Sequence, residues 1–130
     1  MFALNQFPAL SPGFPDVCMT NMGGVDQVIP YPNSALESLG VPFPPNFLVG
    51  GAPVHNMGTV IGTTTDDLPG YAGVASGTVM GPSFSFVNSN TCLMGGLPTK
   101  RVTSFGVSNT INTPFMAATP NQLCVLVLAL

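Results

Sequence analysis

The chain has 130 residues, a length that suits one domain, and 5% of them are charged, against about 25% in an ordinary soluble domain. Because 45% of the residues are hydrophobic and few are charged, intrinsic disorder is excluded. The net charge is −3, with Lys100 and Arg101 as the two basic residues, which excludes nucleic acid as a partner.

The N-terminal residues carry neither a positive segment nor a long hydrophobic one, so the sequence predicts a protein made without a signal peptide. Pro8, Pro12 and Gly13 interrupt residues 1–13, which predicts an irregular N-terminal arm before one domain over residues 14–130. The three cysteines are an odd number, which argues against a closed disulfide framework and favours folding in a reducing cytoplasm.

Residues 34–40 carry helix end signals, with Ser34 as a cap, Glu37 three residues later and Gly40 as a stop. Elsewhere glycine and proline, 15 and 14 in number, separate short apolar runs, and no helical period is sustained over three turns. The sequence therefore predicts an all-β domain of short strands and many Gly/Pro turns, with little helix.

A pattern of six residues occurs twice, as Leu-Val-Gly-Gly-Ala-Pro at 48–53 and as Leu-Met-Gly-Gly-Leu-Pro at 93–98. The apolar pair predicts the end of a strand, and the two glycines predict a turn that needs positive φ. The proline predicts a turn or an edge strand, because it cannot donate a backbone hydrogen bond. In this alignment His55 matches Lys100.

Residues 83–87 alternate serine with larger apolar side chains, which predicts a half-buried strand with Phe84 and Phe86 facing the core or the base of the domain. Residues 122–130 are apolar at most positions, which predicts a strand buried on both faces, with Cys124 in the core.

Five segments, in the same order along the chain, carry a resemblance to a known family. They are Phe-Pro-Asp-Val-Cys at 14–18, Ile-Pro-Tyr-Pro-Asn at 29–33, Gly-Ala-Pro-Val-His-Asn at 51–56, Gly-Val-Ala-Ser-Gly-Thr-Val-Met-Gly-Pro at 73–82 and Gly-Leu-Pro-Thr-Lys-Arg at 96–101. Together they resemble the PAAR-like domain proteins, which sit at the tip of the type VI secretion spike and of related contractile injection machines. The resemblance covers about residues 14–130, and only the second copy of the six-residue pattern is followed by the arginine of the family's repeat.

The resemblance implies a small β-rich cone whose base caps the trimeric VgrG-type spike protein, with one tip per trimer. Its point would lead the transient puncture of a target membrane, and secreted effectors would be attached or recruited. A protein of this kind is made in the bacterial cytoplasm and delivered outside the cell by the injection machine. The high apolar and low charged content fits a surface that a partner covers.

Cys18, His55, Cys92 and Cys124 are the residues of the strongest metal-ligand types, and three cysteines with one histidine can hold zinc. The resemblance likewise implies zinc near the point of the cone, bound by histidine and cysteine. We therefore predict a metal site of Cys18, His55 and Cys92. The alternative is buried thiols and a hydrogen-bonded imidazole, because no short zinc-motif spacing is present.

Lys100 and Arg101 are interpreted as a solvated pair or as bonded to nearby carbonyl groups, with a charged contact to the spike or to an effector as the alternative. Asp66 and Asp67 follow three threonines and are interpreted as a loop cap, with a site for a hard cation as the alternative.

Catalytic motifs are missing from the sequence, which has one histidine, no Gly-x-Ser-x-Gly and no phosphate-binding loop. We therefore expect a structural tip protein and no enzyme. Two alternatives stay open: a small secreted enzyme or toxin that uses Cys18 and His55, and another β-rich subunit of a phage-tail-like assembly.

Overall fold

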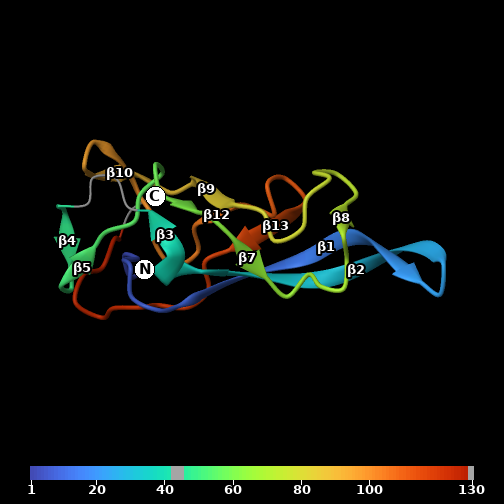
Figure 1. The fold of residues 1–130 in the computed structure, drawn as a ribbon. Helices are drawn as coiled ribbons and strands as arrows, with labels where there is room; N and C mark the ends of the chain where they lie inside the picture. Colours follow the sequence, from blue (N-terminus) through green and yellow to red (C-terminus); the bar gives the residue numbers. More distant parts are fainter. Residues whose placement is uncertain (42–45, 129–130) are drawn as a thin grey trace.

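The computed structural model describes residues 1–41 and 46–128, which form antiparallel β-strands and one short 3-10 helix. The expected all-β architecture is confirmed. Figure 1 shows an elongated molecule, with a long β-hairpin projecting at one end and both termini near the other. The described residues include no helix with the length and hydrophobicity that a membrane span requires.

Nine strands form one sheet, and two further pairs of strands form separate hairpins, β4–β5 and β10–β11. In chain order the elements are β1 (Leu10–Met22), β2 (Val25–Leu36), η1 (Glu37–Leu39), β3 (Gly40–Val41), β4 (Leu48–Val49), β5 (Ala52–Pro53), β6 (Val60–Ile61), β7 (Thr64–Thr65), β8 (Ala72–Gly73), β9 (Ser83–Val87), β10 (Ser89–Met94), β11 (Leu97–Thr99), β12 (Phe105–Ser108) and β13 (Thr113–Met116).

The strand order of the main sheet is β3-β6-β9-β12-β13-β1-β2-β7, with β8 paired to β1. The two strands at the ends of this order, β3 and β7, continue from strands at the opposite end. Only η1 separates β2 from β3, and only residues 62–63 separate β6 from β7. As a result residues 34–41 pair with residues 60–65 through both terminal strand pairs. The sheet therefore closes on itself as a small barrel, which leaves few unpaired edges.

Small polar side chains line much of the interior of this barrel, together with the buried side chains of Ile61 and Phe115. On β9, Ser83 and Ser85 are buried, whereas Phe84 is half-buried and Phe86 is exposed. The predicted strand and its alternation are confirmed. The prediction that Phe84 and Phe86 face the core is wrong, and the alternative that they face the base of the domain stays a prediction. The barrel is narrow at this point, because a Cβ at Gly106 would clash with the backbone of β9. The ring of Phe115 already fills the interior beside Gly106, so the β9 positions that face inward take the small side chains of serine.

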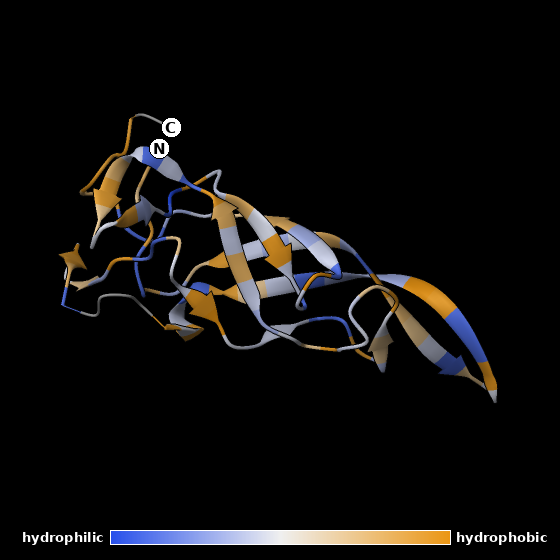
Figure 2. Ribbon diagram, turned by 90° about the horizontal axis from the view of Figure 1, so that it is seen from above, coloured by the Kyte–Doolittle hydropathy of each residue, from blue (hydrophilic) through white to orange (hydrophobic). Residues whose placement is uncertain are grey.

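The apolar core lies at the end that carries the termini. Its buried members are Ala3, Val49, Val54 and Val127, with Cys92, Met94 and Val125 packed against them. Figure 2 shows hydrophobic residues on the short strands of this end. The first residues of the chain belong to this core, and the predicted boundary between residues 13 and 14 falls inside β1.

Both Gly-Gly patterns form hairpin turns, as predicted. The glycines at 50–51 and 95–96 have φ values between +61° and +86°, the region that a turn between two antiparallel strands requires and that glycine enters freely. In each copy the first leucine of the pattern pairs with the proline that ends it. The two copies are therefore equivalent in structure as well as in sequence.

Residues 122–128 do not form the predicted strand buried on both faces. The leucines of this segment are exposed: Leu123, Leu126 and Leu128. The side-chain oxygen of Gln122 accepts hydrogen bonds from the backbone N–H groups of residues 124 and 125, at 2.7 and 2.9 Å. This turn bends the chain, so that Val127 reaches the core while Cys124, expected there, is exposed. Residues 129–130 lie outside the described part of the chain.

The helical turn predicted over residues 34–40 is η1, which is shorter than expected. Ser34 stays in β2, and the N-cap is Leu36, which makes no side-chain capping bond. Gly40 follows the turn as predicted, and its N–H donates to the carbonyl of Glu37. A Cβ at Gly40 would lie 2.8 Å from the ring of His55, so this glycine also makes room for the histidine.

Candidate functional site

Three segments from distant parts of the chain join in a closed ring at the end that carries the termini. We call them the ring segments: residues 2–6, 53–57 and 98–102. The N–H of Leu4 donates to the carbonyl of Lys100 at 3.0 Å. The N–H of Lys100 donates to His55 at 3.0 Å, and that of His55 donates to Leu4 at 2.9 Å. The third hydrogen bond ends at Leu4, the residue from which the first one starts, so the three segments form a closed cycle.

A second set of hydrogen bonds joins the same three segments in the opposite direction, from donors two residues after each centre to acceptors two residues before the next one. The donors and acceptors are Gln6 to Pro53 at 3.0 Å, Met57 to Pro98 at 2.9 Å and Val102 to Phe2 at 2.9 Å. The isolated bridges between the segments follow the same order: Asn5–Val54, Asn56–Thr99 and Ala3–Arg101. The ring segments are therefore related by a pseudo-threefold axis.

Each ring segment also pairs with an outer strand. The outer strands are β4, the end of β10, and residues 125–127, which pair with residues 1–3. A leucine occupies the equivalent position in all three, with exposed fractions of 59%, 57% and 54%. We call them the ring leucines: Leu48, Leu93 and Leu126. Residues 125–127 and 1–3 thus form a third copy of the strand pairing seen in the two hairpins, without a Gly-Gly turn between its strands.

Glu37 lies against this ring and joins two of its central residues. The Lys100 ammonium Nζ lies 2.8 and 3.0 Å from the two carboxylate oxygens of Glu37, and His55 Nδ1 lies 2.9 Å from Oε2. Ser11 Oγ donates to the other oxygen, Oε1. All four side chains are buried. The alignment of His55 with Lys100 in the sequence repeat therefore corresponds to two side chains that reach one carboxylate.

Electrostatics keep Glu37 ionised. Burial alone would raise the pKa of Glu37, but the Lys100 ammonium and the His55 imidazole oppose it and hold the pKa at about 2. Lys100 Nζ also lies 5.3 Å from the centre of the Phe115 ring, a cation–π distance. The interpretation of Lys100 as a solvated residue is wrong, because its ammonium group pairs with a carboxylate inside the molecule.

A second buried polar cluster surrounds Asp16 on β1. Its carboxylate accepts hydrogen bonds from the side-chain amides of Asn33 at 2.5 Å, of Asn109 at 3.1 and 3.3 Å, and of Asn112. The Cys18 thiol lies 3.4 Å from the same carboxylate and donates to it. One oxygen of each Asp16 and Asp67 carboxyl group and Cys18 Sγ all lie within 4.8 Å of one another. This group can hold a metal ion.

Burial and the neighbouring carboxyl groups favour the protonated form of two members of this cluster. Burial raises the pKa of Cys18 to about 12, with help from the hydrogen bond and charge of Asp16 and from the charge of Asp67. Burial also raises the pKa of Asp67, and the proximity of Asp16 adds to this, although the backbone N–H of Met80 favours the charged form. Without a metal ion Cys18 is therefore a thiol.

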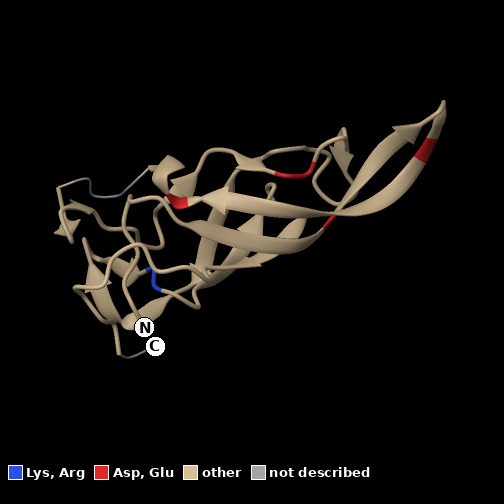
Figure 3. Cartoon of the chain, turned by 90° about the horizontal axis from the view of Figure 1, so that it is seen from below, with Lys and Arg blue, Asp and Glu red and all other residues tan. Residues whose placement is uncertain are grey.

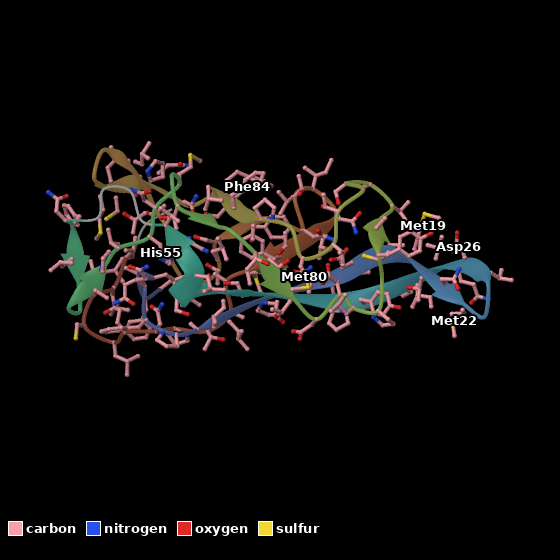
Figure 4. All side chains as sticks on the ribbon, in the orientation of Figure 1. Met19, Met22, Asp26, His55, Met80 and Phe84 are labelled. Atoms are coloured by element: carbon pink, nitrogen blue, oxygen red, sulfur yellow. The ribbon has the colours of Figure 1, made fainter. Side chains whose placement is uncertain are left out.

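The structure separates the residues of the predicted zinc set. Figure 4 places His55 far along the molecule from Met19, the neighbour of Cys18 in β1. Cys18 lies with Asp16 and Asp67, His55 lies with Glu37, and Cys92 is half-buried beside the apolar core. In the described part of the chain, Asp16, Cys18 and Asp67 are the one group of three histidine, cysteine or acidic residues with ligand atoms this close.

Sequence reasoning missed several of these residues. Glu37 was assigned to helix capping, and Asp16 was not singled out. The repeat already aligned His55 with Lys100, and a histidine and a lysine in equivalent positions are a signal for a shared acidic partner. Asp67 was recognised as a loop cap, and its carboxylate does accept the backbone N–H of Met80 at 2.7 Å. The third copy of the strand pairing has no Gly-Gly pair, so the repeat does not reveal it.

Comparison with known families gives one match. A family model described as the toxin PAAR-like domain matches residues 9–115, most of the chain. This match confirms the resemblance that the five segments carry. No curated protein and no solved structure matches the chain.

Proposed function

The chain belongs to the toxin PAAR-like domain family, and from this premise we propose that it is the structural tip of a contractile injection machine. It caps the trimeric VgrG-type spike of a type VI secretion system or of a related machine. The observation that supports this role is the cyclic hydrogen bonding of the three ring segments. A trimer presents three identical surfaces around its axis, and one chain whose surface repeats three times can contact all of them in the same way.

The ring leucines supply the apolar part of this contact. Leu48, Leu93 and Leu126 occupy equivalent positions and are more than half exposed. Burial of a leucine side chain contributes about 1.5–3 kcal/mol, so three equivalent leucines against a trimer give a substantial share of a stable interface.

The β1–β2 hairpin would then lead the puncture of the target membrane, because it projects from the end opposite the ring (Figure 1). Pro30 and Pro32 remove two N–H groups from β2, which protects its open edge from pairing with other strands. The proposal includes delivery of attached effectors outside the producing bacterial cell. It also includes zinc as the cofactor, because a buried thiol among carboxyl groups suits zinc.

We propose a structural role and no enzyme activity. The catalytic alternative needs Cys18 beside His55, whereas the Cys18 thiol donates to Asp16 and His55 contacts Glu37. A nucleophilic cysteine needs a lowered pKa, and that of Cys18 is raised to about 12. No observation favours this alternative over the tip.

The test is co-purification of the untagged chain with a tagged trimeric VgrG-type spike produced in the same cells. We expect a complex of about one chain per trimer, measured by light scattering, because the pseudo-threefold ring uses all three subunits at once. If the chain stays a soluble monomer of 13.4 kDa under mild conditions, the tip role is wrong. Binding of three chains per trimer would also contradict it.

A further inference from the structure

The buried group of Asp16, Cys18 and Asp67 lies away from the ring and has no part in the proposed contact with the spike. Asp16 and Cys18 share β1, and Asp67 lies in the loop after β7. All three are fully buried. Asp67 Oδ2 accepts the backbone N–H of Met80, whereas Oδ1, equally buried, accepts no hydrogen bond from a donor group of the described residues. Its neighbour is the carboxyl group of Asp16, which raises the pKa of Asp67, and two adjacent buried carboxyl groups share either a proton or a metal ion.

The positions of the charged residues also favour a bound cation beside Asp16 and Asp67. The basic residues of the chain are Lys100 and Arg101, and Figure 3 shows them together at the end that carries the termini. The ion pairs of the described residues join Lys100 and His55 to Glu37, and none includes Asp16 or Asp67. Buried acidic groups are ordinarily paired with a cation or coordinate a metal, and the protein supplies no cation here.

We propose that Asp16, Cys18 and Asp67 are the protein ligands of a bound zinc ion. This assignment rests on the zinc of the proposed function and replaces the set of Cys18, His55 and Cys92. A thiolate with carboxylate oxygens suits zinc, whereas calcium and magnesium take oxygen ligands. The Cys18 thiol releases to solvent the proton that it donates to Asp16, and the sulfur then binds the ion.

Three asparagines around Asp16 support this role. The side chains of Asn33, Asn109 and Asn112 donate to the Asp16 carboxylate, and Asn112 Nδ2 also lies 3.9 Å from Cys18 Sγ. Hydrogen bonds of this kind orient the ligands of metal sites. The ion would join β1, which carries the projecting hairpin, to the loop after β7.

Zinc content of the full chain, purified without chelator and dialysed against buffer after zinc addition, tests the assignment. We expect about one zinc ion per chain in the wild-type protein, by mass spectrometry of the metal. Cys18→Ser and Asp67→Asn should lose most of it, with unchanged circular dichroism. Cys92→Ser and Cys124→Ser replace the other two thiols and should retain it.

Cobalt gives a readout that does not depend on the folding of the ligand variants. In the double variant Cys92→Ser/Cys124→Ser, Cys18 is the one remaining thiol. We expect Co²⁺ to give a thiolate-to-cobalt charge-transfer band in this double variant. Absence of the band, absence of zinc from the wild-type chain, or loss of zinc in Cys92→Ser would each overturn the assignment.

Co-purification with the spike is measured on the same samples and keeps the two proposals apart. A chain that binds the spike but holds no zinc overturns the metal site and supports the tip. A chain that holds zinc through Cys18 but binds no spike supports the metal site and overturns the tip.

Discussion

Glu37 shows how a single buried charge joins distant parts of this chain. Its carboxylate accepts hydrogen bonds from Ser11 on β1 and from two of the three central ring residues, His55 and Lys100. Removing one partner from a buried ion pair leaves the other charge uncompensated, which costs about 3–5 kcal/mol. The ring is therefore held from inside by a polar contact, in a molecule with few charges.

Glu37→Gln should lower the free energy of unfolding by about 3–5 kcal/mol at neutral pH, measured by urea denaturation. The pKa of Glu37 is held at about 2 in the folded protein, below the ordinary value of 4.5. The stability that the charged carboxylate contributes is therefore complete above pH 4.5 and is lost as the pH falls towards 2.

The comparison of the two proteins across pH isolates this carboxylate, because the remaining acidic residues are common to both. We expect the difference in unfolding free energy between the wild type and Glu37→Gln to shrink from pH 4.5 to pH 2. Parallel loss of stability in both proteins over this range would contradict the role given to Glu37.

At the scale of elements, the Gly-Gly turns set the geometry of the hairpins that carry two ring leucines. Gly51 has a φ of +86°, and a Cβ there would meet no atom within 4 Å. Gly51→Ala therefore introduces backbone strain without a clash, and should cost about 1–2 kcal/mol of unfolding free energy.

Gly62→Ala is the matched control for this substitution. Gly62 also has open space around a Cβ, but its φ is not positive. We expect this variant to be as stable as the wild type or about 0.4–1 kcal/mol more stable, because alanine lowers the entropy of the unfolded chain. Equal effects of the two substitutions in thermal or urea unfolding would show that the positive φ is not what Gly51 supplies.

The features that the sequence predicted correctly depend on the backbone conformations that neighbouring residues adopt. The two Gly-Gly turns, the single helical turn and the strand at 83–87 all follow from residues next to one another. The prediction of which side chains of that strand face the core was wrong. The narrow barrel beside Gly106, and not the hydrophobicity of Phe84, decides which face of the strand lies inside.

Features that depend on distant contacts were not predictable from the residues alone. The apolar segment 122–128 reads as a buried strand, but the side chain of Gln122 turns it outward. Cysteine and histidine identified the candidate ligand types, whereas the partners of Cys18 proved to be Asp16 and Asp67, brought together by the pairing of strands.

At the scale of the whole molecule, the pseudo-threefold ring explains why residues 1–3 and 125–127 lie side by side. Gly-Gly turns connect two of the ring segments to their outer strands. The third outer strand is residues 125–127, which pair with residues 1–3. A ring of three equivalent sites lets one chain match a threefold partner without being a trimer itself.

Replacing each ring leucine by aspartate tests this symmetry. Leu48→Asp, Leu93→Asp and Leu126→Asp should each weaken binding to the trimeric spike by about tenfold or more, because each loses roughly 1.5–3 kcal/mol of apolar burial. The losses should be similar, since the three positions are equivalent in pairing and in exposure. Val28→Asp, at an equally exposed position on the projecting hairpin, is the control and should bind as the wild type does. Because all four side chains are exposed, the unfolding free energies should stay within about 0.5 kcal/mol of the wild type. A loss confined to one leucine would indicate an asymmetric contact, and equal loss in Val28→Asp would place the spike elsewhere on the molecule.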